Sequence, residues 1–75
     1  MPEIPRITAS EAIKAFEQAG FRVVRKRGSH RILKKDGHRF RLSIPDHGSK
    51  TIGLGLLDSQ IEAAGLTREE FIALL

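Results

Sequence analysis

The chain contains no cysteine, and this absence excludes disulfide bonds and thiolate chemistry. A chain without cysteine is typical of a reducing compartment, so we expect it in the cytoplasm. Its three histidines form no HxxxH motif and no clustered His/Asp pattern, so we expect no metal ion and no other cofactor. No apolar run approaches membrane-spanning length, and residues 1–7 lack the apolar core of a signal peptide, so we expect no membrane partner.

The chain is also short. Its 75 residues are close to the lower limit for a domain that folds without disulfides or metals, and we interpret residues 1–75 as a single domain. A hydrophobic core of this size leaves a net stability of roughly 3–5 kcal/mol. Such a margin favours a habitual binding partner.

Positive charge is concentrated in the middle of the chain. Residues 21–50 carry ten lysines and arginines against two aspartates, a net charge of +8, whereas residues 1–20 carry −1 and residues 51–75 carry −3, which gives +4 overall. Charge confined in this way creates a field suited to a polyanion. We expect nucleic acid rather than a membrane surface, because this segment has the pattern of strands and not of an amphipathic interfacial helix.

Capping residues predict where the helices begin and end. Thr8 and Glu11 have the spacing of a capping box, and Gly20 is expected to end that first helix. A short helix over residues 56–65 is predicted to bury the apolar side chains Leu57, Ile61 and Ala64. A second capping box, Thr67 with Glu70, begins a C-terminal helix that is predicted to bury Phe71, Leu74 and Leu75.

Between the first two helices, residues 21–27, 30–35 and 38–45 have the β-branched, alternating pattern of three strands. Asp36 and Gly37 are typical of a two-residue hairpin turn, and Pro45 ends the third strand. The predicted fold class is therefore α+β, in the order α-β-β-β-α with a short C-terminal helix. We expect a small two-layer sandwich, with the helices on one face of a three-stranded antiparallel sheet and the other face open to solvent.

A two-residue turn also fixes a hairpin register. It pairs Leu33 with Phe40, Arg31 with Leu42 and Ser29 with Ile44, and it predicts that Phe40, Leu42 and Ile44 face the core. His30 then lies opposite Ser43, with Arg41 two positions along, on the open face that also carries Arg39. A three-residue loop would slip this register and turn one strand over, but we prefer the two-residue version.

His30 is the candidate catalytic residue. An imidazole titrates near neutral pH, so it can take a proton from a ribose 2′-hydroxyl and return one to a leaving oxygen. Surrounding cations would hold the phosphodiester and stabilise its transition state. The alternative is a surface histidine beside a turn. We interpret His38 as structural or solvated, and His47 as either a general acid or an ordinary loop residue.

The candidate RNA-binding residues surround this histidine. Gly28 and Ser29 allow a phosphate to approach the backbone amides. No aromatic residue falls among the cations of the predicted open face, so we expect recognition of RNA backbone and shape rather than base stacking. The candidates for RNA contact are Ser29, Arg31, Lys34, Arg39, Arg41, His47 and Lys50, and the further cations of the basic segment are Arg25, Lys26 and Arg27.

Three segments, "IPRITASEAIKAFEQAGFRVVRKRGSHRIL", "IPDHGSK" and "AGLTREEFIALL", together resemble the HicA toxins, the mRNA interferases of HicA–HicB toxin–antitoxin pairs. The resemblance implies a fold similar to a double-stranded RNA-binding domain, ribosome-independent cleavage of mRNA, and a HicB-type antitoxin as partner. Its Gly-Ser-His motif implies that His30 is catalytic. The chain departs from the family pattern in its second helix, where Asp58 and Glu62 stand at positions that are commonly basic.

Three functional hypotheses follow. The first is a toxin with metal-independent endoribonuclease activity. The second is a non-catalytic module that binds double-stranded RNA through the same basic face. The third is an interaction protein whose cations dock an acidic partner. Loss of cleavage without His30 would separate the first two, and a strong salt dependence of binding would separate both from the third.

Overall fold

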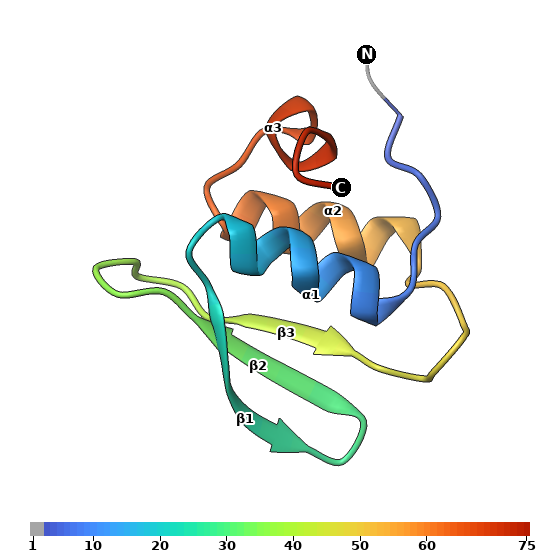
Figure 1. Cartoon of the computed structure of the whole chain (residues 1–75), viewed down its shortest axis with the longest axis horizontal. Helices are drawn as coiled ribbons and strands as arrows, with labels where there is room; N and C mark the ends of the chain where they lie inside the picture. Colours follow the sequence, from blue (N-terminus) through green and yellow to red (C-terminus); the bar gives the residue numbers. More distant parts are fainter. Residues whose placement is uncertain (1–2) are drawn as a thin grey trace.

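A helix, three antiparallel strands and two further helices follow one another in the computed structural model, which describes residues 3–75. The helices lie on one side of the sheet, and its opposite side is open (Figure 1). The predicted α+β fold class is therefore confirmed. Residues 1 and 2, which belong to the predicted domain and to the N-terminal stretch discussed above, lie outside the described residues. Among the described residues, no helix has the length and apolar character needed to cross a membrane.

The first helix, α1 (Ala9–Gln18), begins and ends as its sequence predicts. The Thr8 hydroxyl accepts a hydrogen bond from the Glu11 amide at 3.3 Å, while the Glu11 carboxylate accepts one from the Thr8 amide at 3.0 Å. At the other end Gly20 has a φ of 102°, and the Phe21 amide donates back to the Phe16 carbonyl at 3.0 Å. This is the Schellman arrangement that a glycine permits.

The two later helices are α2 (Leu54–Ala63) and α3 (Arg68–Ile72). Helix α2 begins two residues before its predicted start, because its N-cap is Gly53, which has no side chain to signal a boundary. The predicted capping box at Thr67 is present and begins α3. Phe71 is fully buried as predicted, whereas the prediction that Leu75 is buried is wrong, since half of its surface is exposed.

The sheet has the order β1-β2-β3, so that β2 (His30–Lys34) lies between β1 (Arg22–Arg27) and β3 (Leu42–Pro45). Val23 pairs with Leu33, but the next pair is Arg25 with Ile32, so Val24 is an extra residue that forms a β-bulge. The outer edge of β3 is covered in part by α2, since the Ser43 amide donates to the side-chain oxygen of Gln60 at 2.9 Å.

The predicted hairpin register between β2 and β3 is wrong by two residues. Leu33 pairs with Leu42, not with Phe40, and Arg31 pairs with Ile44. Asp36 and Gly37 do form a tight turn, closed by the His38 amide donating to the Lys35 carbonyl at 3.0 Å. The ladder does not continue from that turn, and residues 35–41 form a loop that contains Arg39, Phe40 and Arg41.

Contacts of His38 explain why the ladder stops. Its Nε2 lies 2.7 Å from the Ala63 carbonyl oxygen at the end of α2, and its ring packs edge-on against Phe21, with 5.2 Å between ring centres. These contacts draw the segment after the turn toward the helices and away from β2. Phe40, which was predicted to face the core, is instead 55% exposed. Of the two interpretations of His38, structural or solvated, the structure confirms the structural one.

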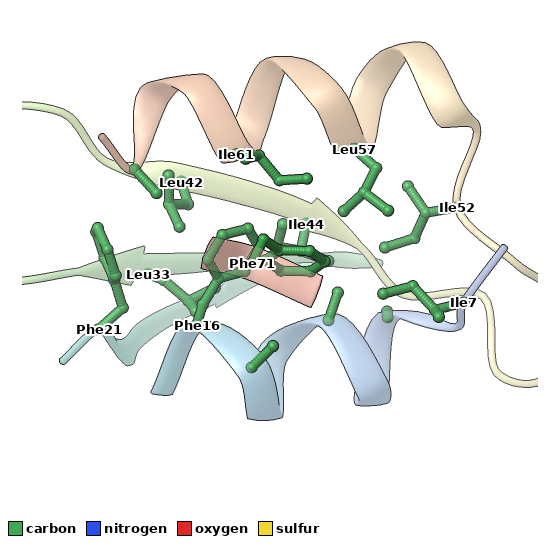
Figure 2. Close-up of a cluster of buried hydrophobic side chains, with 14 residues drawn as sticks. Ile7, Phe16, Phe21, Leu33, Leu42, Ile44, Ile52, Leu57, Ile61 and Phe71 are labelled. Carbon is green, nitrogen blue, oxygen red and sulfur yellow. The ribbon is translucent and has the colours of Figure 1, made fainter. Parts of the chain in front are cut away.

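The core lies between the sheet and the helices (Figure 2). Its centre is aromatic: the Phe16 ring of α1 lies 4.9 Å from the Phe71 ring of α3 and 6.1 Å from the Phe21 ring. Leu33 and Leu42 are fully buried beneath them. Because a shift of two residues leaves each side chain on the same face of its strand, the core side and the open side of β2 are those that the sequence predicts.

Candidate nucleic-acid interface and catalytic histidine

His30 lies on the open face of the sheet, at the first position of β2, and its side chain is exposed. Its cross-strand neighbours are Arg27 of β1 and Pro45 of β3. Residues that pair directly across an antiparallel ladder point to the same face. The register therefore defines the open face as the residues Arg22, Arg25, Arg27, His30, Ile32, Lys34, Ser43 and Pro45.

The bulge at Val24 determines which cations of β1 share this face with the histidine. Because the extra residue resets the alternation, Arg25 lies opposite Ile32 and Arg27 lies opposite His30. Both arginines are exposed, and neither forms an ion pair within the described residues. Uncompensated guanidinium groups beside an exposed imidazole form a surface that can hold a phosphodiester.

The turn before His30 is short and open. Gly28 and Ser29 are the two residues between the paired positions Arg27 and His30, and Gly28 has a φ of 55°. Glycine at the first position of a two-residue hairpin turn supplies the positive φ that such turns require. A Cβ atom at Gly28 would meet nothing within 4 Å, so the backbone at this turn is accessible to a ligand.

Asp46 joins the two segments that carry His30 and His47. Its amide donates to the Ser29 carbonyl at 2.6 Å, and its carboxylate accepts a hydrogen bond from the Gly48 amide at 3.1 Å. The same carboxylate lies 3.6 Å from the guanidinium of Arg31. Sequence reasoning missed this residue, although an aspartate two positions before a glycine is typical of a side-chain-bonded turn.

Arg31, a predicted RNA contact, lies on the side of β2 opposite to His30, where it pairs with Ile44. Its side chain is mostly buried, and besides facing Asp46 it donates to the Gly28 carbonyl at 3.0 Å. These contacts link the turn before His30 to the loop after β3. The exposed side chains of His47 and Lys50 lie in that loop, where the Lys50 amide approaches the His47 carbonyl at 3.4 Å.

The other predicted contacts lie at the opposite end of β2. Lys34 is the last residue of the strand, on the open face, and Arg39 and Arg41 are exposed in the loop beyond it rather than in a third strand as predicted. Apart from Arg31, the structure thus divides the candidate residues into two groups. Ser29, His47 and Lys50 lie near His30, whereas Lys34, Arg39 and Arg41 lie along β2 and past its far end.

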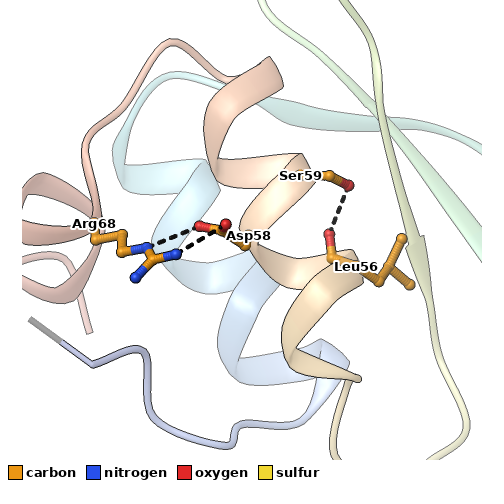
Figure 3. Close-up of polar contacts among 4 residues, drawn as sticks. All are labelled: Leu56, Asp58, Ser59 and Arg68. Atoms are coloured by element: carbon orange, nitrogen blue, oxygen red, sulfur yellow. Dashed lines mark hydrogen bonds and ion pairs between the residues drawn. The ribbon is translucent and has the colours of Figure 1, made fainter.

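Helix α2 contributes an acid that is already paired (Figure 3). Asp58 accepts two hydrogen bonds from Arg68, both at 3.0 Å, which tie α2 to the start of α3. The hydrogen bonds from the guanidinium lower the pKa of Asp58, and the same contacts raise the pKa of Arg68. An acid at this position, where the resemblance led us to expect a base, therefore has a structural partner. Ser59 in the same helix donates to the Leu56 carbonyl at 3.0 Å.

Within residues 3–75, no three side chains of the kinds that bind metals are grouped closely enough to hold an ion. The geometry that the structure does present is an exposed histidine beside Arg27, next to a glycine turn and to the loop that carries His47.

Comparison with known proteins identifies one matching family. A family model described as the HicA toxin of bacterial toxin–antitoxin systems matches residues 9–66, a range that includes α1, the whole sheet and α2. No curated protein matches the chain.

Proposed function

The chain belongs to the HicA toxin family, and from this premise we propose that it is an endoribonuclease that cleaves mRNA without a metal ion. Membership of a toxin–antitoxin family implies a cognate antitoxin as its partner. The observation that best supports the proposed activity is the placement of His30, which is exposed on the open face beside the uncompensated Arg27.

In the proposed reaction, His30 accepts the proton of a ribose 2′-hydroxyl as the 2′-oxygen attacks the adjacent phosphorus. The bond from phosphorus to the 5′-oxygen of the next nucleotide breaks, and that oxygen takes up a proton. The products are a 2′,3′-cyclic phosphate and a 5′-hydroxyl. Arg25 and Arg27 stabilise the extra negative charge that develops on the phosphoryl oxygens.

The leaving 5′-oxygen needs a proton donor. His47 is the candidate, because Asp46 holds its loop against the turn that precedes His30. In this role the two histidines act as a base and an acid on opposite sides of the phosphorus. The Gly28–Ser29 turn supplies accessible backbone amides for a non-bridging phosphate oxygen.

The antitoxin is proposed to be a HicB-type protein that covers the open face, so that bound antitoxin and bound RNA exclude each other. A partner on this face would also neutralise the concentrated positive charge of β1 and β2. Cleavage of mRNA places the action of the free toxin in the cytoplasm.

The central test is the His30→Ala variant. It is expected to lose RNA cleavage and growth arrest while it keeps its circular dichroism spectrum and most of its affinity for RNA, because His30 is exposed and supports no buried contact. Wild-type protein should cleave a defined transcript in the presence of EDTA. Intact RNA after incubation with folded, RNA-binding wild-type protein would instead favour a non-catalytic RNA-binding module.

The roles of the two histidines can be separated with an activated substrate. The substrate is a uridine 3′-phosphodiester with a p-nitrophenyl leaving group. Its p-nitrophenolate departs without protonation, so cleavage of this substrate needs a base but no acid. We expect His47→Ala to cleave this substrate at nearly the wild-type rate while it cleaves RNA slowly, and His30→Ala to be inactive on both. Equal losses on both substrates would remove His47 from the acid role.

A further inference from the structure

The loop that joins β2 to β3, residues 35–41, exposes an aromatic ring between two cations. Phe40 is 55% exposed, the largest exposed fraction among the bulky apolar side chains that the structure describes. Its neighbours Arg39 and Arg41 are both exposed, and neither forms an ion pair within residues 3–75. The guanidinium carbon of Arg39 lies 5.7 Å from the centre of the Phe40 ring.

The root of this loop is held by contacts to the folded body. His38 is fixed by the Ala63 carbonyl and by the Phe21 ring, and its own ring lies 6.3 Å from that of Phe40 in an edge-on arrangement. At the other side of the turn, the Arg22 guanidinium lies 3.2 Å from the Asp36 carboxylate. The ring of Phe40 is therefore presented to solvent from an anchored loop.

An exposed aromatic face flanked by guanidinium groups is the composition of a single-stranded nucleic-acid site. Every base has a π-face that can stack on such a ring, and arginines on either side can contact the phosphates of the same nucleotide and the next. We propose that Phe40 stacks on an unpaired base of the RNA substrate, with Arg39 and Arg41 on the flanking phosphates. This inference rests on the proposed ribonuclease function and deepens it.

The position of the loop makes this a binding contact away from the reaction. His30 and Lys34 are the two ends of β2, which at 3.3 Å per residue lie about 13 Å apart. The loop begins beyond Lys34, at the end of the sheet opposite to the turn before His30 (Figure 1). The stacked base is therefore separated from the scissile phosphate, and the RNA would run along β2, past the exposed Lys34, to reach it.

The charge of the loop favours RNA over a protein as its occupant. The one acid in residues 35–41 is Asp36, which pairs with Arg22, whereas Arg39 and Arg41 remain uncompensated beside the ring. A stacked base must also be unpaired, because the faces of paired bases are hidden within a duplex. The site thus predicts a preference for single-stranded RNA over a duplex of the same sequence.

The first experiment measures binding and cleavage by Phe40 variants. In the non-cleaving His30→Ala background, Phe40→Ala should bind a single-stranded oligoribonucleotide roughly 5- to 150-fold more weakly, and Phe40→Tyr should retain affinity. The matched control is Leu56→Ala, which truncates an exposed apolar side chain outside the loop, on α2. This variant should bind RNA with unchanged affinity. In the active protein, Phe40→Ala should raise KM for a long RNA, leave kcat unchanged, and leave cleavage of a dinucleotide unchanged.

The second experiment detects the stacking itself. The chain contains no tryptophan or tyrosine, so Phe40→Trp introduces a single fluorophore at the proposed contact. Its fluorescence should be quenched by single-stranded RNA and much less by an RNA duplex at the same concentration. A Leu56→Trp control should show little change with either.

The outcomes separate this inference from the function on which it rests. If RNA is bound and cleaved but Phe40→Ala has wild-type affinity and KM, or if Phe40→Trp is not quenched, the stacking role is overturned and the ribonuclease stands. The stacking role would likewise be overturned if Phe40→Ala weakened binding to a protein partner but left the affinity for RNA unchanged. If the wild-type protein neither binds nor cleaves RNA, both proposals are overturned together.

Discussion

Replacing Arg25 and Arg27, the two arginines of β1 on the open face that form no ion pair within the described residues, should lower the salt dependence of RNA binding by a calculable amount. Six exposed cations on the proposed RNA path form no ion pair within the described residues, and they are Arg25, Arg27, Lys34, Arg39, Arg41 and Lys50. If each contacts one phosphate of a single strand, the logarithm of the binding constant falls with the logarithm of the salt concentration with a slope of about −4. A rise in salt from about 50 to 200 mM then weakens binding roughly 300-fold.

The Arg25→Ala/Arg27→Ala double variant leaves four of these contacts. Its slope should be about −3, and the same rise in salt should weaken binding roughly 50-fold. The matched control is Arg6→Ala/Lys14→Ala, which removes the same charge from exposed positions outside the sheet and should keep the slope near −4.

Fluorescence anisotropy with a labelled single-stranded RNA, measured in the non-cleaving His30→Ala background at several salt concentrations, gives both slopes. Equal slopes for the two double variants would refute the reasoning, because they would show that total charge and not the open face governs binding. A slope near zero for the protein with all its cations would favour an interaction protein that docks an acidic partner.

Three further predictions concern the scaffold. Asp58→Asn should destabilise the protein at neutral pH, and the difference in stability from wild type should disappear as pH falls below about 4. The reason is that a carboxylate whose pKa is lowered by Arg68 adds stability only while it is ionised. Urea denaturation at several pH values measures this difference. Thr8→Ala removes an N-cap and should cost about 1 kcal/mol of unfolding free energy, seen as a lower urea midpoint with an unchanged m-value. Asp46→Ala should reduce kcat for RNA between about tenfold and a hundredfold without weakening RNA binding, because it frees the loop of His47 and removes a negative charge; a loss of affinity instead would contradict this positioning role.

The helices could be predicted from the sequence because their ends carry local chemical signals. Thr8 and Thr67 each have a glutamate three residues later, and both capping boxes form. Gly20 adopts the positive φ that ends α1. The start of α2 could not be predicted, since Gly53 has no side chain to mark it and the helix is positioned by the burial of Leu57 and other apolar residues.

The hairpin shows where local signals are insufficient. Asp36 and Gly37 correctly predict a turn, but the register of the strands depends on which apolar residue opposes Leu33. Leu42 takes that place because His38, four residues earlier, is bound to the end of α2. A contact across 25 positions of the chain leaves no trace in the local sequence pattern.

Within the candidate site, the residues on strands could be predicted from the sequence, whereas those in loops could not. Strand alternation predicts that His30 is exposed. That prediction is correct although the register is wrong, because a shift by two residues leaves each side chain on the same face of its strand. Asp46 and Phe40 were missed or misplaced, because their positions depend on the loops that meet at the two ends of β2. The roles of all these residues in binding and catalysis stay predictions.

The bulge in β1 gives this strand an unusual tolerance to deletion. In most strands, the loss of one codon moves every later side chain to the other face. Val24, however, has no partner of its own in the ladder, so a chain that lacks it can keep Arg25 opposite Ile32 and Arg27 opposite His30 in a regular strand. Deletion of Lys26 would also be absorbed by loss of the bulge, with Arg27 still opposite His30, but it would place Arg25 opposite Arg31 and so move that arginine off the open face. A variation in length that leaves the open face intact is therefore expected at the adjacent valines Val23 and Val24, whose deletion gives the same sequence, and not at Lys26.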